Sequence, residues 1–155
     1  MFRGLEYQTM QVESFMLCHA ATSDGGKLNV LGAFDAIYAK TVPAKHPSCA
    51  LALRIRFDRA EQGRHQIKLS MVDADGKPVG NFPESVCEVR MADNQSYAVV
   101  NQIVNLIGLP LKNYGNYAID LSIDNRHEAS LPLEVRPIPQ SPNAPAADAD
   151  EPWAT

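Results

Sequence analysis

Alternating apolar and polar side chains between residues 50 and 58 constrain the fold of this chain more than any other feature of its sequence. The apolar positions hold Leu51, Leu53, Ile55 and Phe57, and the positions between them hold Ala52, Arg54 and Arg56. Successive side chains of a β-strand point to opposite faces, so a strand here has one apolar face and one wet face. A helix with the same spacing would place the arginines all around its cylinder. The pattern therefore predicts a strand.

Two further apolar runs precede this strand. They cover residues 15–21 and 28–39, and the sequence Thr-Ser-Asp-Gly-Gly joins them. Asp-Gly and Gly-Gly supply the positive φ angles of hairpin turns, so we expect the two runs to pair as a hairpin. Both runs are apolar on both faces, which predicts that they are covered on both sides. Gly32 interrupts the second run and is a candidate for a bulge that shifts the alternation of faces.

A second alternating segment, at residues 64–73, follows a short loop. Its apolar residues are Ile67, Leu69 and Met71. If this segment pairs with the strand at 50–58 so that Arg56 lies opposite Gln66, the apolar faces of both strands stay together, as a stable register requires. The sequence therefore predicts that these two strands are neighbours in one sheet.

The same register brings four basic residues to one wet face as a positive stripe. They are Arg54, Arg56, Arg64 and Lys68. Asp58 would lie opposite Arg64, whereas Arg54 and Lys68 would form an unfavourable like-charge pair. The four residues are candidates for binding an acidic protein partner or the acidic tail of another copy of the chain, because arginine is enriched at interfaces. The alternative is a solvated sheet face that acids from the next strand neutralise.

The C-terminal half of the chain continues the strand pattern. Strands are predicted at residues 86–91, 96–111, 117–123 and 131–135. Residues 125–127 suit a three-residue hairpin loop that places Leu131 opposite Leu121. Pro132 indicates an edge position or a bulge. Tyr117 follows Gly115 at the start of a strand, as in the tyrosine corner of immunoglobulin-like sandwiches, where the hydroxyl bonds to upstream backbone.

These segments predict an all-β fold: a two-layer antiparallel β-sandwich of about eight strands with immunoglobulin-like, Greek-key connections. A barrel is the alternative. We expect a loosely ordered N-terminus over residues 1–11, a β-sandwich domain over 12–136 and a disordered tail over 137–155. The tail is rich in proline and acidic residues and holds no basic residue, so it cannot bury enough apolar surface to offset its ordering entropy.

Several segments, taken in order, resemble an uncharacterised family of small bacterial proteins described as a domain of unknown function. They are LCHA, GGKLNVLGAFDAI, PAKHPSCALALRIRF, NYGNYAIDLSIDN and LPLEV. The resemblance covers residues 15–136 and depends on the order of the segments. It implies a compact, bacterial, single-domain protein. It implies no established activity, so it assigns no catalytic residue.

Composition argues against several classes of function. A generic nucleic-acid binder is basic, whereas this chain of 155 residues carries a net charge of -4. No apolar run is long enough to span a bilayer, and the first residues lack the order of a signal peptide. We therefore expect a cytoplasmic protein with no membrane and no nucleic-acid partner. Its three cysteines, Cys18, Cys49 and Cys87, are expected to be reduced thiols that act as small hydrophobes.

No motif in the chain predicts a cofactor or a metal. Residues 25–27, Gly-Gly-Lys, lack the spacing of a phosphate loop, and residues 73–76 suit a plain Asp-Gly turn better than a calcium loop. The neighbours Cys18 and His19, and His46 with Cys49, invite a zinc interpretation, but structural thiols explain them better. His65 and His127 fall near expected hairpin loops, where a solvated histidine is normal.

The function predicted from the sequence is that of a non-enzymatic cytoplasmic interaction module that binds a protein partner or another copy of itself. The alternative is a small-molecule-binding or enzymatic β-sandwich with a site between loops. A pocket that contains a perturbed histidine or carboxylate would favour the alternative, and a broad flat face would favour the interaction module.

Overall fold

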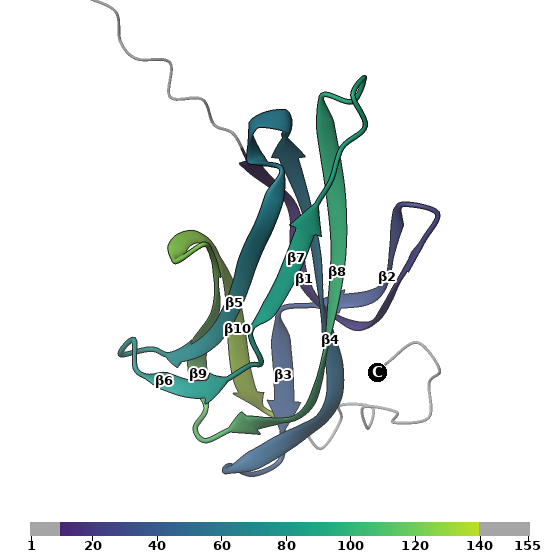
Figure 1. Cartoon of the computed structure of the whole chain (residues 1–155). Helices are drawn as coiled ribbons and strands as arrows, with labels where there is room; N and C mark the ends of the chain where they lie inside the picture. The colour runs from purple at the N-terminus through teal and green to yellow at the C-terminus, as the bar shows by residue number, and fades with distance from the viewer. Residues whose placement is uncertain (1–9, 140–155) are drawn as a thin grey trace, which may run out of the picture.

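The computed structural model describes residues 10–139, which form two facing β-sheets (Figure 1). Sheet A has the order β2-β1-β4-β8, with bounds Lys27–Phe34, Met10–Asp24, Ala44–Asp58 and Tyr97–Leu111. Sheet B has the order β3-β10-β9-β5-β6, with bounds Ala36–Ala39, Arg126–Pro137, Gly115–Ile123, Gly63–Asp73 and Pro78–Asn81. Strand β7, Ser85–Val89, pairs with β5. The predicted all-β sandwich is confirmed.

The described residues contain ten strands rather than the eight that were predicted. The segment at 28–39 was predicted as one strand, but it divides at Asp35. Strand β2 stays in sheet A, and β3 crosses to sheet B, where it pairs with β10 in parallel. The other additional strand is the short β6. The sandwich is therefore antiparallel except for the β3–β10 pair.

The core lies between the two sheets and follows the alternation of the sequence. Strand β4 contributes Leu51, Leu53, Ile55 and Phe57, β5 contributes Ile67, Leu69 and Met71, and β9 contributes Ile119 and Leu121. Each of these side chains is buried almost completely, which stabilises the fold by about 1.5–3 kcal/mol per side chain.

The predicted pairing of β4 with β5 is wrong. Strand β4 pairs with β1 and β8, whereas β5 pairs with β6, β7 and β9. The turn η1, Arg59–Glu61, carries the chain from one sheet to the other, and the Asp58 amide donates to Glu61 Oε1 at 3.0 Å. The apolar faces of β4 and β5 thus meet across the core instead of lying side by side. Alternation alone does not distinguish these two arrangements.

The β1–β2 hairpin is confirmed, but Gly32 is a bend rather than a bulge. Gly25 and Gly26 form the turn with φ of 56° and 75°. The pairing register of β1 and β2 is the same on both sides of Gly32, whose φ is 66°. The chain therefore changes direction at this residue without gaining one.

Beyond this bend the hairpin covers the outer face of sheet A. By their spacing Leu28, Val30 and Phe34 share one face of β2, yet Phe34 packs on the main core. Leu28 and Val30 pack instead on a second cluster, formed by Cys18, Ala50 and Ala52. The prediction that both faces of these strands are covered is therefore confirmed for only part of the hairpin, since Leu31 is 65% exposed.

The β9–β10 hairpin has a shorter turn than predicted. Asp124 and Asn125 form a two-residue turn, with φ of 51° and 63°. The register then shifts between His127 and Ala129, and Leu131 lies opposite Ile119 rather than opposite Leu121. The shift restores the apolar face that the shorter turn would otherwise have reversed.

Two local predictions for this hairpin are confirmed. The Tyr117 hydroxyl donates to the Asn113 carbonyl at 2.8 Å and accepts from the Asn113 amide at 3.0 Å, which is the predicted tyrosine corner. Pro132 lies at an edge, since β3 pairs with β10 only from Glu134 onward.

The described strands run from Met10 to Pro137, close to the expected boundaries of the domain. The expected N-terminal segment up to residue 9 and the tail from residue 140 lie outside the described residues. Among residues 10–139 there is no helix of the length and apolar character needed to cross a membrane.

Candidate functional site

The four basic residues expected to form one stripe lie on the outward faces of two different sheets. Arg54 and Arg56 belong to β4 of sheet A, and Arg64 and Lys68 belong to β5 of sheet B. The shared face depended on the β4–β5 register, which is wrong. These four residues therefore do not form one stripe, and a binding role for any of them stays a prediction.

Arg54 and Arg56 have partners within the domain. Glu13 on the neighbouring strand β1 lies 2.9 Å from Arg56 Nε and 3.6 Å from Arg54 Nε. Arg54 Nη1 also donates to Asn101 Oδ1 at 3.0 Å and to the Gly26 carbonyl at 3.2 Å. Arg54 thus holds the tip of the β1–β2 hairpin against the outer face of sheet A, and Glu13 from the neighbouring strand offsets one of the two positive charges.

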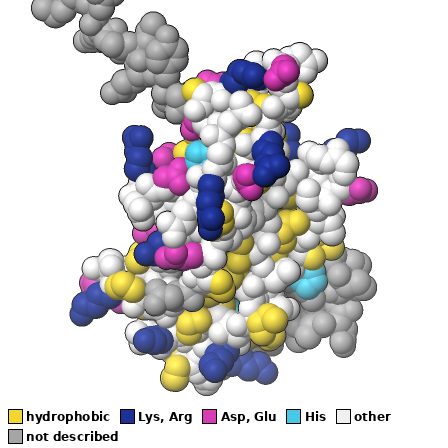
Figure 2. All heavy atoms as spheres, in the orientation of Figure 1, with side chains coloured by type: hydrophobic (Ala, Val, Ile, Leu, Met, Phe, Trp, Pro, Cys, Tyr) yellow, Lys and Arg dark blue, Asp and Glu magenta, His cyan; other side chains and the backbone are white. Residues whose placement is uncertain are grey.

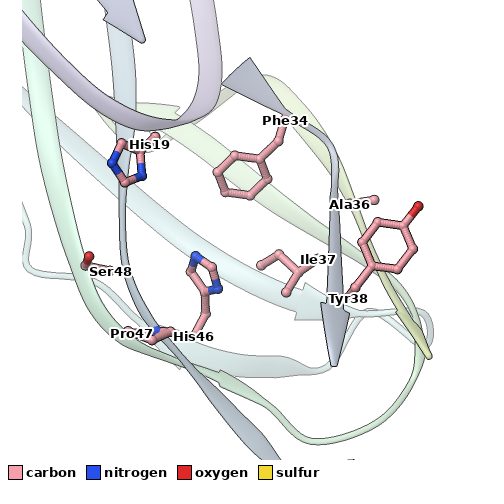
Figure 3. Close-up of a pocket in the computed structure, with 8 residues that line it drawn as sticks. All are labelled: His19, Phe34, Ala36, Ile37, Tyr38, His46, Pro47 and Ser48. Atoms are coloured by element: carbon pink, nitrogen blue, oxygen red, sulfur yellow. The ribbon is translucent and has the colours of Figure 1, made fainter. Parts of the chain in front are cut away.

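A pocket of about 430 Å³ lies beside the crossing from β2 to β3 and takes its walls from four strands (Figure 3). It is lined by His19 of β1, Phe34 of β2, Ala36, Ile37 and Tyr38 of β3, and His46, Pro47 and Ser48 of β4. The rings of His19, Phe34 and His46 point toward a common space (Figure 3). The Phe34 and His46 centroids are 6.0 Å apart. We call this site the histidine pocket.

The bend at Gly32 and the break at Asp35 build the histidine pocket. A Cβ atom on Gly32 would lie 3.2 Å from the Cβ of His19, so glycine permits the two strands to approach closely here. After Asp35 the chain enters sheet B, which places Tyr38 across the pocket from His19. The hydroxyl of Tyr38 accepts a hydrogen bond from Arg136 Nη1 at 3.3 Å.

Burial lowers the pKa of His46 below its ordinary value, and the nearby imidazole of His19 lowers it further, against a backbone hydrogen bond at Ser48 that raises it. His46 is therefore neutral at pH 7. A neutral imidazole has one donor and one acceptor nitrogen. The pocket thus combines an aromatic and aliphatic wall with a few hydrogen-bonding groups, which suits a ring-bearing or aliphatic ligand group.

The thiols near this pocket are poorly suited to hold zinc. Burial raises the pKa of Cys18, and it raises that of Cys49 to about 11, whereas a zinc ligand must be a thiolate. The Cys18 thiol donates to the Ala50 carbonyl at 3.5 Å. Residues 10–139 contain no group of three or more potential metal ligands. That the thiols are reduced and bind no metal stays a prediction.

A cysteine, a histidine and an aspartate also come together in sheet B. Cys87 lies directly opposite His65 across β5 and β7, and His65 Nδ1 lies 2.6 Å from Asp124 Oδ2. His65 Nε2, however, contacts the Glu61 carbonyl oxygen at 2.5 Å and is not directed to the thiol. Burial raises the pKa of Cys87, and the charge of Asp124 raises it further. This arrangement does not activate a nucleophile.

The two histidines expected to be solvated differ from each other. The side chain of His65 is only 12% exposed and stacks on Phe57, with centroids 4.7 Å apart, so the prediction for it is wrong. The shorter β9–β10 turn brings Asp124 over the His65 ring, which the sequence pattern did not reveal. His127 is 59% exposed, as predicted.

Comparison with known proteins places the chain in a family. The sequence profile of a family of unknown function matches residues 13–136. The chain belongs to this family, DUF6941. This match confirms the predicted resemblance to an uncharacterised domain. No curated protein matches the chain.

Solved structures similar to this chain include the β-glucosidase from Listeria innocua. Its complex with isofagomine superposes with a TM-score of 0.50 at 9% identity and covers 82% of this chain. The complex with glucose and a further crystal structure of the enzyme have TM-scores of 0.49 and 0.48, with the same identity and coverage. The chain spans only 16% of the enzyme's length. At this identity the likeness shows the fold alone.

Sequence reasoning missed most of the histidine pocket. It considered His19 and His46 only as partners of cysteines, and it left Phe34, Tyr38 and Ser48 without a role. A signal was present in the sequence: residues 36–57 contain one histidine, two prolines, two lysines and two arginines but no acid. A stretch without acids in a protein of negative net charge indicates a locally basic surface.

Proposed function

We propose that this protein is a non-enzymatic binding module that recognises a segment of a protein partner through the histidine pocket. The observation that carries the proposal is the pocket itself, which is preformed, partly aromatic and large enough for one or two side chains. In this proposal the protein acts in the bacterial cytoplasm. Its thiols are reduced, and it has no nucleic-acid or membrane partner.

Exposed apolar side chains around the pocket support a macromolecular partner. Tyr38 lines the pocket and is 51% exposed. Ile107 is 85% exposed and lies opposite Ser48, another lining residue. Apolar groups gathered at the rim of a pocket are typical of protein interaction sites.

The test is photo-cross-linking from Tyr38, which lies at the edge of the pocket (Figure 3). The full chain is expressed with p-benzoylphenylalanine in place of Tyr38, and a matched control carries it in place of Val86, which is 49% exposed on sheet B. We expect adducts with a defined protein from position 38 and not from position 86, and a several-fold lower yield when His46→Ala is added. Equal adducts at both positions, or a yield that His46→Ala leaves unchanged, would contradict the proposal.

A small-molecule ligand is the second candidate. The pocket volume and the lowered pKa of His46 favour it, because both are common in sites for small ligands. Native mass spectrometry of the full chain purified from cells distinguishes the two candidates. A co-purifying mass of a few hundred daltons that His46→Ala removes would favour the small ligand over the protein segment.

A further inference from the structure

The histidine pocket is one end of a continuous track around the loop between β3 and β4. A second hollow, of about 290 Å³, shares Ile37, Tyr38, His46 and Pro47 with it and adds Lys40 and Lys45. A third, of about 390 Å³, shares Ala44, Lys45 and Leu111 with the second and adds Lys112. The second hollow adjoins each of the other two, so an extended peptide can lie along all three.

The track is basic at one end and aromatic at the other. Lys40, Lys45 and Lys112 line the second and third hollows, and no aspartate or glutamate lines any of the three. The nearest acids on β10 and in the β2–β3 crossing are Glu134, which pairs with Arg136 at 2.7 Å, and Asp35. In Figure 2 the lowest end of the visible face, where Figure 1 places the β3–β4 loop, shows basic and hydrophobic side chains. The track therefore suits a peptide with acids followed by an aromatic residue.

The sequence of the chain itself contains such a peptide. Residues 148–153 read Asp-Ala-Asp-Glu-Pro-Trp, and Trp153 is the one tryptophan of the chain. Strand β10 ends at Pro137, which lies opposite Ala39 of β3, and Ala39 lines the second hollow. The last described strand thus ends beside the surface whose charge complements that of the segment.

We propose that residues 148–153 of the same chain occupy this track, with Trp153 in the histidine pocket and the acids beside Lys40 and Lys45. This inference rests on the proposed function, because residues 148–153 would compete with the protein partner for the histidine pocket. The six residues span up to about 20 Å when extended, and the residues between Pro139 and Asp148 supply about 30 Å of further reach. A tethered segment has an effective concentration of the order of millimolar, so weak contacts are enough to hold it.

The segment needs no fold of its own to bind in this way. Tryptophan offers a large apolar surface with few rotatable bonds, and its indole N–H needs an acceptor, which a neutral imidazole or the Ser48 hydroxyl provides. The lysine contacts are exposed, so salt weakens them. Occupancy of the pocket by its own tail would oblige a partner to displace it.

The first test uses the full, purified chain with p-benzoylphenylalanine in place of Tyr38. We expect a cross-link to a peptide within residues 140–155, in a product with the mass of a monomer and a yield that tenfold dilution leaves unchanged. Lys40→Glu with Lys45→Glu should lower the yield several-fold, and the control Arg64→Glu should not. Cross-links between two copies, or equal yields from position 86, would overturn the proposal.

The second test keeps Tyr38 and uses the fluorescence of Trp153. We expect the native emission maximum to lie at a shorter wavelength than that of the urea-unfolded chain and to shift toward it in 0.5 M salt or with the double lysine reversal. An emission maximum and acrylamide quenching equal to those of the unfolded chain would overturn the proposal. In that case an adduct of position 38 with another protein would still support the proposed function. If instead the proposed function is wrong, that adduct is absent while the Trp153 emission still shifts.

Discussion

Strand β4 carries basic side chains near both of its ends, but only those near its C-terminal end have partners within the described domain. Near its C-terminal end Arg54 and Arg56 share Glu13, and Arg54 also holds the hairpin tip and Asn101. Near its N-terminal end Lys45 lines two hollows and, among residues 10–139, forms no ion pair. Cations that the fold already uses stabilise it, whereas cations that the fold leaves open are available to a ligand. Basic residues that form no ion pair within residues 10–139 therefore mark the candidate site better than the number of basic residues does.

Removing Arg54 is the strongest way to test this difference. We expect Arg54→Ala to lower the free energy of unfolding by about 1–3 kcal/mol, because it removes the charged donor of the Asn101 amide oxygen and one of the two donors of the Gly26 carbonyl. Urea denaturation followed by circular dichroism measures the change. The matched control is Lys45→Ala, for which we expect little change. Equal losses for the two variants would mean that the ends of β4 do not differ.

Gly32→Ala tests the bend in β2 that lies against His19 at the histidine pocket. We expect a loss of about 1–2 kcal/mol, since an L residue is strained at a φ of 66° and the new Cβ would lie 3.2 Å from the Cβ of His19. Thermal unfolding measures it, and Gly25→Ala serves as the control, since it has a positive φ of 56° in open space. A Gly32 variant no less stable than the control would contradict the close approach on which the pocket depends.

The histidines differ in the same way as the cations. Burial lowers the pKa of His65, but hydrogen bonds to Glu61 and Asp124 outweigh it and raise the pKa overall, while burial lowers the pKa of His46. Charged His65 therefore adds stability that is complete below about pH 6.5 and is lost as the pH rises through its folded pKa. Neutral His46 adds stability that is present above that pH and is lost on acidification.

Nuclear magnetic resonance titration of the two rings measures both shifts. We expect His65 to titrate above, and His46 below, the pH at which each titrates in the unfolded chain. His65→Gln should remove the part of the stability loss that His65 causes as the pH rises above about 6.5. A His65 ring that titrates below its unfolded value would show that its two acceptors do not hold it in the charged form.

Much of the fold was predictable because alternation determines which face of a strand is buried. The faces of β4, β5 and β9, the first hairpin and the Tyr117 corner follow from residue types that act within a few positions. Alternation does not determine whether two strands pair or face each other, so the β4–β5 register and the stripe built on it were wrong. The pocket was missed for the same reason: its walls come from β1, β2, β3 and β4, which only the crossing at Asp35 brings together.

The smallest expected effect on stability is that of reversing the two track lysines. We expect Lys40→Glu with Lys45→Glu to change the free energy of unfolding by no more than about 0.5 kcal/mol, because exposed side chains that form no ion pair within residues 10–139 contribute little to the stability of the domain. Arg54→Glu in the same assay should cost far more, since it places a second acid beside Glu13. If the lysine reversal is silent in urea denaturation yet changes cross-linking at position 38, the two ends of β4 differ in use as well as in charge. If it destabilises the fold as strongly as Arg54→Glu, the lysines have partners in the domain, and the track is not an open binding surface.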